Sequence, residues 1–247
     1  MCGRFALTST PKDVAALFDI MDVEDFPPRF NISPTQPILM IAAGPRQPSG
    51  SNLPERQALL VRWGLLPAWA KDPKDMPLLI NARSETAAQK AAFRAAMRHR
   101  RTLVPASGFY EWRREGKGRA QPYWLRPKSG GLIAFAGLME TWMEPGGSEI
   151  GTGAILTTEA SDDLAAIHSR MPVVIPPEHF SRWLDCVRSE PRDVADLLRS
   201  AEPGFFEAIP VSDRVNSVAN LGPEIQERAE PAQDRPAESA AEQLQLF

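Results

Sequence analysis

The chain has 247 residues, of which 43% are hydrophobic and 24% charged, values typical of a globular protein with a sizeable core. No apolar run is long enough to span a membrane, and the first residues lack the basic-then-apolar pattern of a secretion signal. Only two cysteines are present, so we expect a cytoplasmic protein without a disulfide framework.

The formal net charge of −3 is unevenly distributed. Six acidic and two basic residues lie between positions 221 and 247, so the part of the chain before them is close to neutral. A nucleic-acid partner would therefore require a local basic surface. Composition neither supports nor excludes such a surface.

The first half of the chain predicts a capped helix followed by a hairpin. Thr10, Pro11 and Asp13 are typical of a helix start, and we expect this helix to run through Ile20. Two apolar runs then flank a loop rich in Gly, Pro and Ser, which predicts a hairpin formed by residues 36–43 and 57–63.

The segment 85–98 is rich in alanine and carries Phe93 and Met97 four residues apart, so we expect a helix there. Turn-prone residues separate short predicted strands at 103–112, 122–125, 132–139, 150–157 and 205–211. Short helices are expected at 161–167, 177–184 and 191–199. Strands that follow one another directly favour an α+β fold with mainly antiparallel pairing.

Cys2 is the first residue that could carry chemistry. Removal of Met1 would leave an α-amine and a thiol on one residue, with ordinary pKa values of about 7.7–8.0 and about 8.5. The amine could form an imine with an aldehyde, and the thiol could then close a five-membered ring. Alternatively, Cys2 could be the nucleophile of an amide hydrolase, or could pack as a small apolar side chain.

Glu111 and His168 are the candidates for proton transfer. Glu111 lies between aromatic residues, where burial would raise its pKa, although strand alternation also predicts an outward-facing glutamate. His168 is the best placed of three histidines to exchange a proton near pH 7, but a single loop histidine is more often structural. Cysteines and histidines are too few for a zinc site, so neither a metal nor a cofactor is expected.

Asn81 and Arg83 offer a carboxamide and a guanidinium that suit a phosphate or a nucleotide edge. Simple helix capping by Ser84 is the alternative. Trp63 and Trp69 offer aromatic faces on which bases could stack, although tryptophans are more often part of a core.

Six motifs, taken in this order, resemble the SRAP (SOS-response-associated peptidase) family over roughly residues 1–215. They are Met1-Cys2-Gly3-Arg4-Phe5, Asn31-Ile32-Ser33-Pro34, Trp63-Gly64-Leu65 with Pro67 and Trp69, Asn81-Ala82-Arg83 with Glu85-Thr86, Gly108-Phe109-Tyr110-Glu111-Trp112, and His168-Ser169-Arg170-Met171-Pro172. The resemblance implies a mainly antiparallel β pseudo-barrel with peripheral helices. We expect this domain to span residues 1–222, followed by a disordered tail over 223–247.

The resemblance also implies a function, which is to bind single-stranded DNA and to shield abasic sites through a thiazolidine formed by Cys2. Asn81 would orient the sugar and the N-terminus. Glu111 would transfer a proton during imine formation, and His168 would open the deoxyribose ring and assist reversal. Six residues are expected to contact the DNA: Arg4, Asn31, Trp69, Arg83, Thr157 and Arg170.

Other functions remain open at this stage. Glutamine amidotransferases also begin Met-Cys-Gly, the family name suggests a peptidase, and a non-covalent single-strand-binding module would leave Cys2 structural. We expect a monomer without membrane contact. The last residues resemble peptides that bind the replication sliding clamp, with Gln243, Leu244, Leu246 and Phe247 as the anchors.

Overall fold

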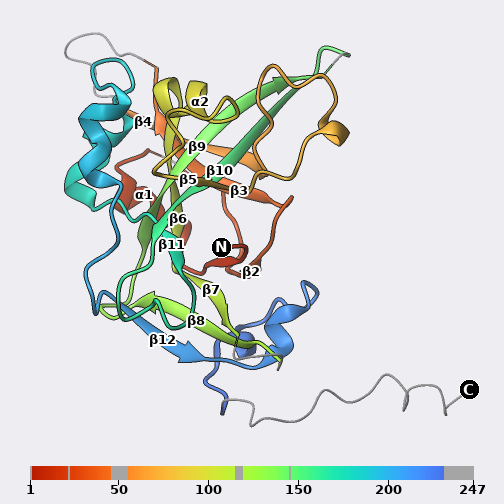
Figure 1. The fold of residues 1–247 in the computed structure, drawn as a ribbon, viewed down its shortest axis with the longest axis vertical. Coiled ribbons are helices and arrows are strands. Elements are labelled where there is room, and N and C mark those ends of the chain that lie inside the picture. Colours follow the sequence, from red (N-terminus) through yellow and green to blue (C-terminus); the bar gives the residue numbers. More distant parts are fainter. Residues whose placement is uncertain (1, 22, 46–54, 115–118, 145, 231–247) are drawn as a thin grey trace, which may run out of the picture.

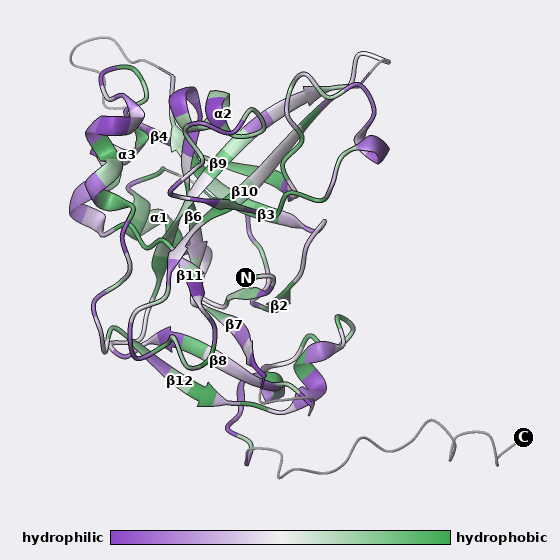
Figure 2. Cartoon of the chain, in the orientation of Figure 1, coloured by the Kyte–Doolittle hydropathy of each residue, from purple (hydrophilic) through white to green (hydrophobic). Residues whose placement is uncertain are grey.

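The computed structural model describes residues 2–21, 23–45, 55–114, 119–144 and 146–230. In this part of the chain, two sheets lie one above the other and short helices lie at their periphery (Figure 1). The prediction of an α+β fold with mainly antiparallel strands is therefore confirmed. Figure 2 shows that hydrophobic residues concentrate in the strands, whereas the helices carry hydrophilic stretches on their outer sides.

The larger sheet closes into a five-stranded barrel. Its strands follow the order β10-β4-β3-β6-β9, and β9 pairs again with β10. They are β3 (Pro37–Ala43), β4 (Arg56–Trp63), β6 (Arg101–Ala106), β9 (Ile133–Met143) and β10 (Glu149–Glu159). Two short strands extend the sheet beside β10: β5 (Asn81–Arg83) and β11 (Arg170–Pro172). β10 runs parallel to β4 and β5, in contrast to the antiparallel pairing elsewhere.

Glycines on two barrel strands make room for the side chains that fill the interior. A Cβ at Gly153 on β10 would lie 2.3 Å from Cε of Met40, and a Cβ at Gly137 on β9 would lie 2.6 Å from Oγ1 of Thr102. Met40 itself is fully buried. Close packing in the barrel interior therefore favours glycine at both positions.

The smaller sheet has the strand order β12-β8-β7-β1-β2 and lies below the barrel in Figure 1. Its strands are β1 (Phe5–Leu7), β2 (Arg29–Ile32), β7 (Gly108–Arg113), β8 (Gln121–Pro127) and β12 (Phe206–Pro210). The N-terminal end of the chain lies between the two sheets in this view. A cluster that includes Tyr110, Trp124 and Ile225 packs the smaller sheet against the end of the described chain.

The helices are short and lie outside the sheets. They are α1 (Pro11–Phe18), α2 (Arg94–His99), α3 (Phe180–Leu184), and the 3₁₀ helices η1 (Pro73–Asp75), η2 (Pro177–His179), η3 (Pro191–Leu197), η4 (Asp213–Asn216) and η5 (Pro223–Gln226). The predicted capping box is present, because Thr10 and Asp13 each accept from the other's backbone N–H. The hairpin of β3 and β4 is also confirmed, although most of its connecting loop lies outside the described residues.

The prediction of a long helix at 85–98 is wrong, since only α2 is helical and residues 85–93 form turns. Hydrogen bonds in these turns alternate between partners three and four residues apart. Ala87 and Phe93 are buried, so tertiary packing overrides the helix propensity of the alanines. Residues 162–167 likewise form turns instead of the helix expected at 161–167.

The single strand expected at 103–112 is two strands, β6 and β7, which belong to different sheets. Ser107 lies at the switch, where its hydroxyl accepts from the backbone N–H of Thr8 at 2.9 Å. The folded chain also continues beyond the expected boundary at residue 222, because Ile225 is fully buried and Gln226 donates to the Tyr110 hydroxyl at 3.0 Å. Residues 231–247 lie outside the described part.

Candidate active site

Cys2 is fully buried and lies just before β1. Its Sγ donates to the carbonyl of Arg4 at 3.8 Å, and Nδ2 of Asn81 donates to the Cys2 carbonyl at 2.7 Å. Asn81 begins β5, which runs beside β10, so a barrel strand fixes this contact. The other amide atom of Asn81, Oδ1, is buried and has no hydrogen-bond partner among the described residues. It is therefore available to accept from a group placed beside the N-terminus.

Glu111 lies on β7 and is 3% exposed. Burial raises the pKa of its carboxyl group to about 7. Burial also raises the pKa of the Cys2 thiol, and the nearby Glu111 charge raises it further. The thiol is therefore protonated near neutral pH, whereas the carboxyl group changes its charge there.

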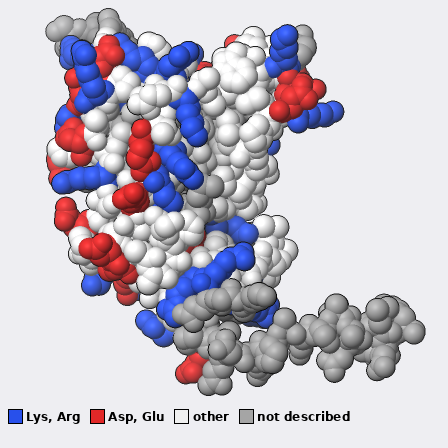
Figure 3. Space-filling model, viewed as in Figure 1, with Lys and Arg blue, Asp and Glu red and all other residues white. Residues whose placement is uncertain are grey.

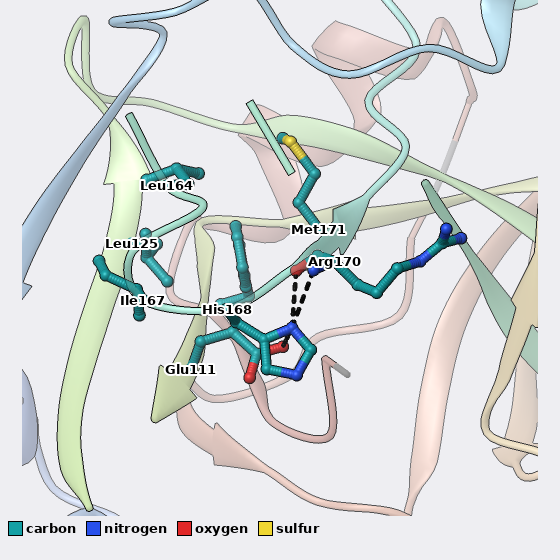
Figure 4. A pocket seen from close by; sticks show the side chains of 8 residues that line it. Glu111, Leu125, Leu164, Ile167, His168, Arg170 and Met171 are labelled. Carbon is teal, nitrogen blue, oxygen red and sulfur yellow. Dashed lines mark hydrogen bonds and ion pairs between the residues drawn. The ribbon is translucent and has the colours of Figure 1, made fainter. Parts of the chain in front are cut away.

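His168 follows the turns of residues 162–167 and brings its ring to Glu111. Nδ1 of His168 lies 3.9 Å from Oε1 of Glu111 and accepts from the backbone N–H of Arg170 at 2.9 Å (Figure 4). Burial lowers the pKa of His168. The ring is therefore neutral near pH 7, beside an acid that titrates in the same range.

An apolar pocket lies under this carboxyl–imidazole pair. It is lined by Phe109, Glu111, Leu125, Leu164, Ile167, His168, Arg170 and Met171. In Figure 4 the apolar side chains lie on one side of Glu111 and His168, and the Arg170 guanidinium points away from the ring. These surroundings are the physical cause of the shifted pKa values.

Arg4 lies beside the N-terminus and is held by the protein itself. One guanidinium nitrogen donates to Oδ1 of Asn31 at 2.6 Å and to the carbonyl of Val215 at 2.9 Å. Asn31 is 2% exposed, and its amide nitrogen bonds the carbonyls of Val215, Ser217 and Asn220. The Asn31 side chain thus holds Arg4 and the C-terminal segment, and its contact with DNA stays a prediction.

Thr157 is fully buried on β10, and its contact with DNA likewise stays a prediction. Its carbonyl accepts from the backbone N–H of Ser84 at 2.9 Å and also from Nη2 of Arg170. Thr157 therefore fixes the residues around the site instead of facing solvent.

Two of the other expected DNA contacts are exposed. Arg83 ends β5 and is exposed, and Trp69 is 59% exposed, whereas Trp63 is fully buried. In Figure 3, Lys and Arg side chains gather near the junction of the barrel and the smaller sheet. This face supplies the local basic surface that the overall charge does not.

The sequence identified Cys2, Asn81, Glu111 and His168, and the structure brings all four together. It missed Glu85, whose carboxylate pairs with the Arg170 guanidinium at 2.7 Å. The signal was present, since both residues belong to motifs already singled out. No group of three or more His, Cys, Asp or Glu side chains that could hold a metal ion occurs among the described residues.

The fold and the site together define a class: a small α+β barrel protein whose cysteine at position 2 lies beside a buried glutamate, a histidine and an asparagine. The chain belongs to the SOS response associated peptidase (SRAP) family, which matches residues 1–218.

Curated relatives agree with this membership, and a solved structure agrees with the fold. The abasic site processing protein YoqW of Bacillus subtilis is 38% identical over 228 residues, covering 91% of this chain and 98% of its own length. The abasic site processing protein YedK of Escherichia coli is 33% identical, covering 91% and 98%. A crystal structure of a Bacteroides thetaiotaomicron protein matches with a TM-score of 0.79 over 93% of this chain and 100% of its own, at 24% identity, which shows the fold. Within the described residues, no helix is long and apolar enough to cross a membrane.

Proposed function

We propose that this chain binds single-stranded DNA and shields abasic sites by a covalent, reversible thiazolidine link from Cys2, formed after Met1 has been removed. Relatives named as abasic site processing proteins support the substrate class. The observation that carries the chemistry is a buried carboxyl group with a pKa of about 7, placed between a buried cysteine and a histidine.

The reaction begins with the sugar, because an abasic deoxyribose is mainly a closed hemiacetal. Ring opening requires removal of the hydroxyl proton at C1′ and protonation of the ring oxygen as the C1′–O4′ bond breaks. A neutral His168 accepts the first proton, and the conjugate acid returns one to the ring oxygen. The product is a free aldehyde next to the N-terminus.

The α-amine of Cys2 then adds to the aldehyde carbon, which gives a carbinolamine. Glu111 in its protonated form donates to the departing hydroxyl group, so that water leaves, and the resulting carboxylate takes the nitrogen proton back, which gives a neutral imine. Finally, the thiol adds to the imine carbon while its proton passes to the imine nitrogen, which closes the thiazolidine. Because burial keeps the thiol protonated, the amine reacts first.

Asn81 holds the reacting residue in place. Its Nδ2 fixes the Cys2 carbonyl, and its Oδ1 is buried and free to accept from the α-amine or from a sugar hydroxyl. Arg4 and Arg83 would bind the flanking phosphates, Arg170 would contribute a further cation, and Trp69 would stack against a base.

A denaturing gel tests the proposal. Purified protein is mixed with a single-stranded oligonucleotide that carries one abasic site, and a covalent complex appears as a slower band. Cys2→Ala should lose the stable band. Cys186→Ser, which removes the half-buried second cysteine far along the chain, should retain it. No band with the wild-type protein, or an undiminished band with Cys2→Ala, would overturn the proposal.

Cys2→Ser separates the two bond-forming steps. It retains the α-amine but loses the thiol, so an imine should form that survives denaturation only after reduction with borohydride. A borohydride-independent band of wild-type intensity would show that the thiol takes no part.

We also propose that the C-terminal residues dock on the replication sliding clamp. Leu244, Leu246 and Phe247 follow Gln243 as spaced apolar anchors after a polar leader, which suits a groove on a partner. These residues lie outside the described part, so the proposal rests on the sequence. Deletion of residues 243–247 should abolish pull-down by the clamp, and an unchanged pull-down would refute it.

A further inference from the structure

The His168 ring faces two polar atoms of one backbone. Its Nδ1 lies 2.9 Å from the N–H and 3.2 Å from the carbonyl oxygen of Arg170, and Figure 4 draws both contacts. A neutral ring accepts from the N–H, whereas a protonated ring donates to the carbonyl. The ring therefore has a partner in either protonation state and does not have to turn when it gains or loses a proton.

The position of that backbone depends on the Arg170 side chain. Arg170 is the first residue of β11, a strand of three residues, and pairs with Glu159 on β10. Its guanidinium bonds both carboxylate oxygens of Glu85, at 2.7 and 3.0 Å, and also the carbonyl and hydroxyl of Thr157. Glu85 follows β5, so this clamp joins the segments on both sides of β10.

We propose that Glu85 is a positioning residue. It binds the Arg170 side chain and thereby fixes the Arg170 backbone N–H and carbonyl, the two partners of His168 Nδ1. The His168 ring can then gain or lose a proton without changing its orientation. The inference rests on the proposed function, because it concerns the acid–base step of that reaction. Glu85 does not touch the reacting atoms. Its effect reaches them through the Arg170 guanidinium, the Arg170 backbone and the imidazole in turn.

A positioning role for Glu85 predicts different effects on the crosslinking rate and on the affinity for single-stranded DNA. Glu85 is exposed at the rim of the site, and its carboxylate neutralises a cation that would otherwise be available to DNA phosphate. Removing the carboxylate should therefore leave affinity for single-stranded DNA unchanged or increase it. Crosslinking and its reversal should nevertheless become slower, since His168 loses its fixed partner. A residue that only stabilised the fold would lower both together.

The test compares Glu85→Gln and Arg170→Lys with a matched control. Asp196→Asn also removes a carboxylate that forms a bidentate pair with an exposed arginine, Arg182, but in η3. Three quantities are measured in the full-length protein: the protonation pattern of the His168 ring nitrogens by NMR with isotope-labelled histidine, the affinity for an undamaged single strand, and the crosslinking rate on an abasic strand.

For Glu85→Gln and Arg170→Lys we expect the Nδ1-acceptor form of His168 to give way to a mixture of tautomers. Crosslinking should slow roughly fivefold, which corresponds to about 1 kcal/mol. Glu85→Gln should bind the undamaged strand at least as tightly as the wild type, and Asp196→Asn should match the wild type in all three measurements. Glu85→Asp, which keeps the charge, should recover part of the rate.

An unchanged His168 spectrum in both variants would overturn the inference, whatever happens to the rate. So would a parallel loss of affinity and rate in Glu85→Gln. If the wild-type protein forms no crosslink at all, the proposed function fails, while the NMR comparison still decides whether Glu85 orients His168.

Discussion

Replacement of Glu111 by glutamine should stabilise the protein above pH 7 while it removes the acid that the proposed function assigns to imine formation. Burial raises the pKa of Glu111 from its ordinary 4.5 to about 7. Between these values the folded protein holds a proton that the unfolded chain has released. The free energy of unfolding of the wild type therefore falls as pH rises through this window, and it levels off above the folded pKa.

The size of the effect follows from the two pKa values. The interval from 4.5 to about 7 corresponds to a loss of about 3 kcal/mol of unfolding free energy, since each tenfold change in proton affinity equals about 1.4 kcal/mol. Glutamine has no proton to lose, so the variant avoids this destabilisation. In a protein of this size the difference corresponds to roughly 6–12 °C in melting temperature.

Urea or thermal unfolding at a series of pH values from 4.5 to 8 would measure the effect. The stability difference between Glu111→Gln and the wild type should grow in favour of the variant as pH rises, and then become constant. Glu207→Gln is the control, because it removes a partly exposed carboxylate that pairs with Arg126 on the smaller sheet. A Glu111→Gln difference that stays flat across the range would refute the argument that burial sets the pKa of Glu111.

Three further changes test the packing, each by chemical unfolding at one pH. Arg101→Met should lower the free energy of unfolding by about 2–4 kcal/mol, because the buried guanidinium donates to four backbone carbonyls that would lose their partner. A loss below about 0.5 kcal/mol would contradict this reasoning. Gly153→Ala should cost about 1–3 kcal/mol, since its Cβ would overlap Met40 in the barrel, and a neutral result would show that the methionine moves aside freely. Ile225→Ala should cost about 2–4 kcal/mol, whereas Val218→Ala, at a half-exposed side chain, should stay within about 1 kcal/mol. Equal effects of these two would place residue 225 outside the folded domain.

Local signals in the sequence predicted the elements that depend on local chemistry. The capping box at Thr10 and Asp13 formed as expected, because its hydrogen bonds join residues only three apart. The segment at 85–98 had a strong helix propensity, yet burial of Ala87 and Phe93 against distant strands decided its conformation. The short strands β5 and β11 have no periodicity of their own, since each is defined only by pairing with β10.

In the candidate site, too, the sequence indicated individual residues but not the contacts between distant segments. Residue chemistry and the family resemblance identified Cys2, Asn81, Glu111 and His168. Their mutual placement depends on strands far apart in the chain, which a spacing along the sequence does not reveal. The burial of Asn31 was equally invisible, because its three carbonyl partners lie more than 180 positions later.

The burial of Cys2 has a consequence for biosynthesis. Its surroundings include Glu111, and the neighbouring Arg4 is held through Val215, so the pocket is complete only after nearly all of the domain has been translated. At about 5–20 residues per second, this takes roughly 10–40 s after the N-terminus has been made. During that interval the pocket around Cys2 is still incomplete. Under the proposed function, the α-amine of Cys2 is therefore most readily exposed during translation, before Cys2 becomes buried.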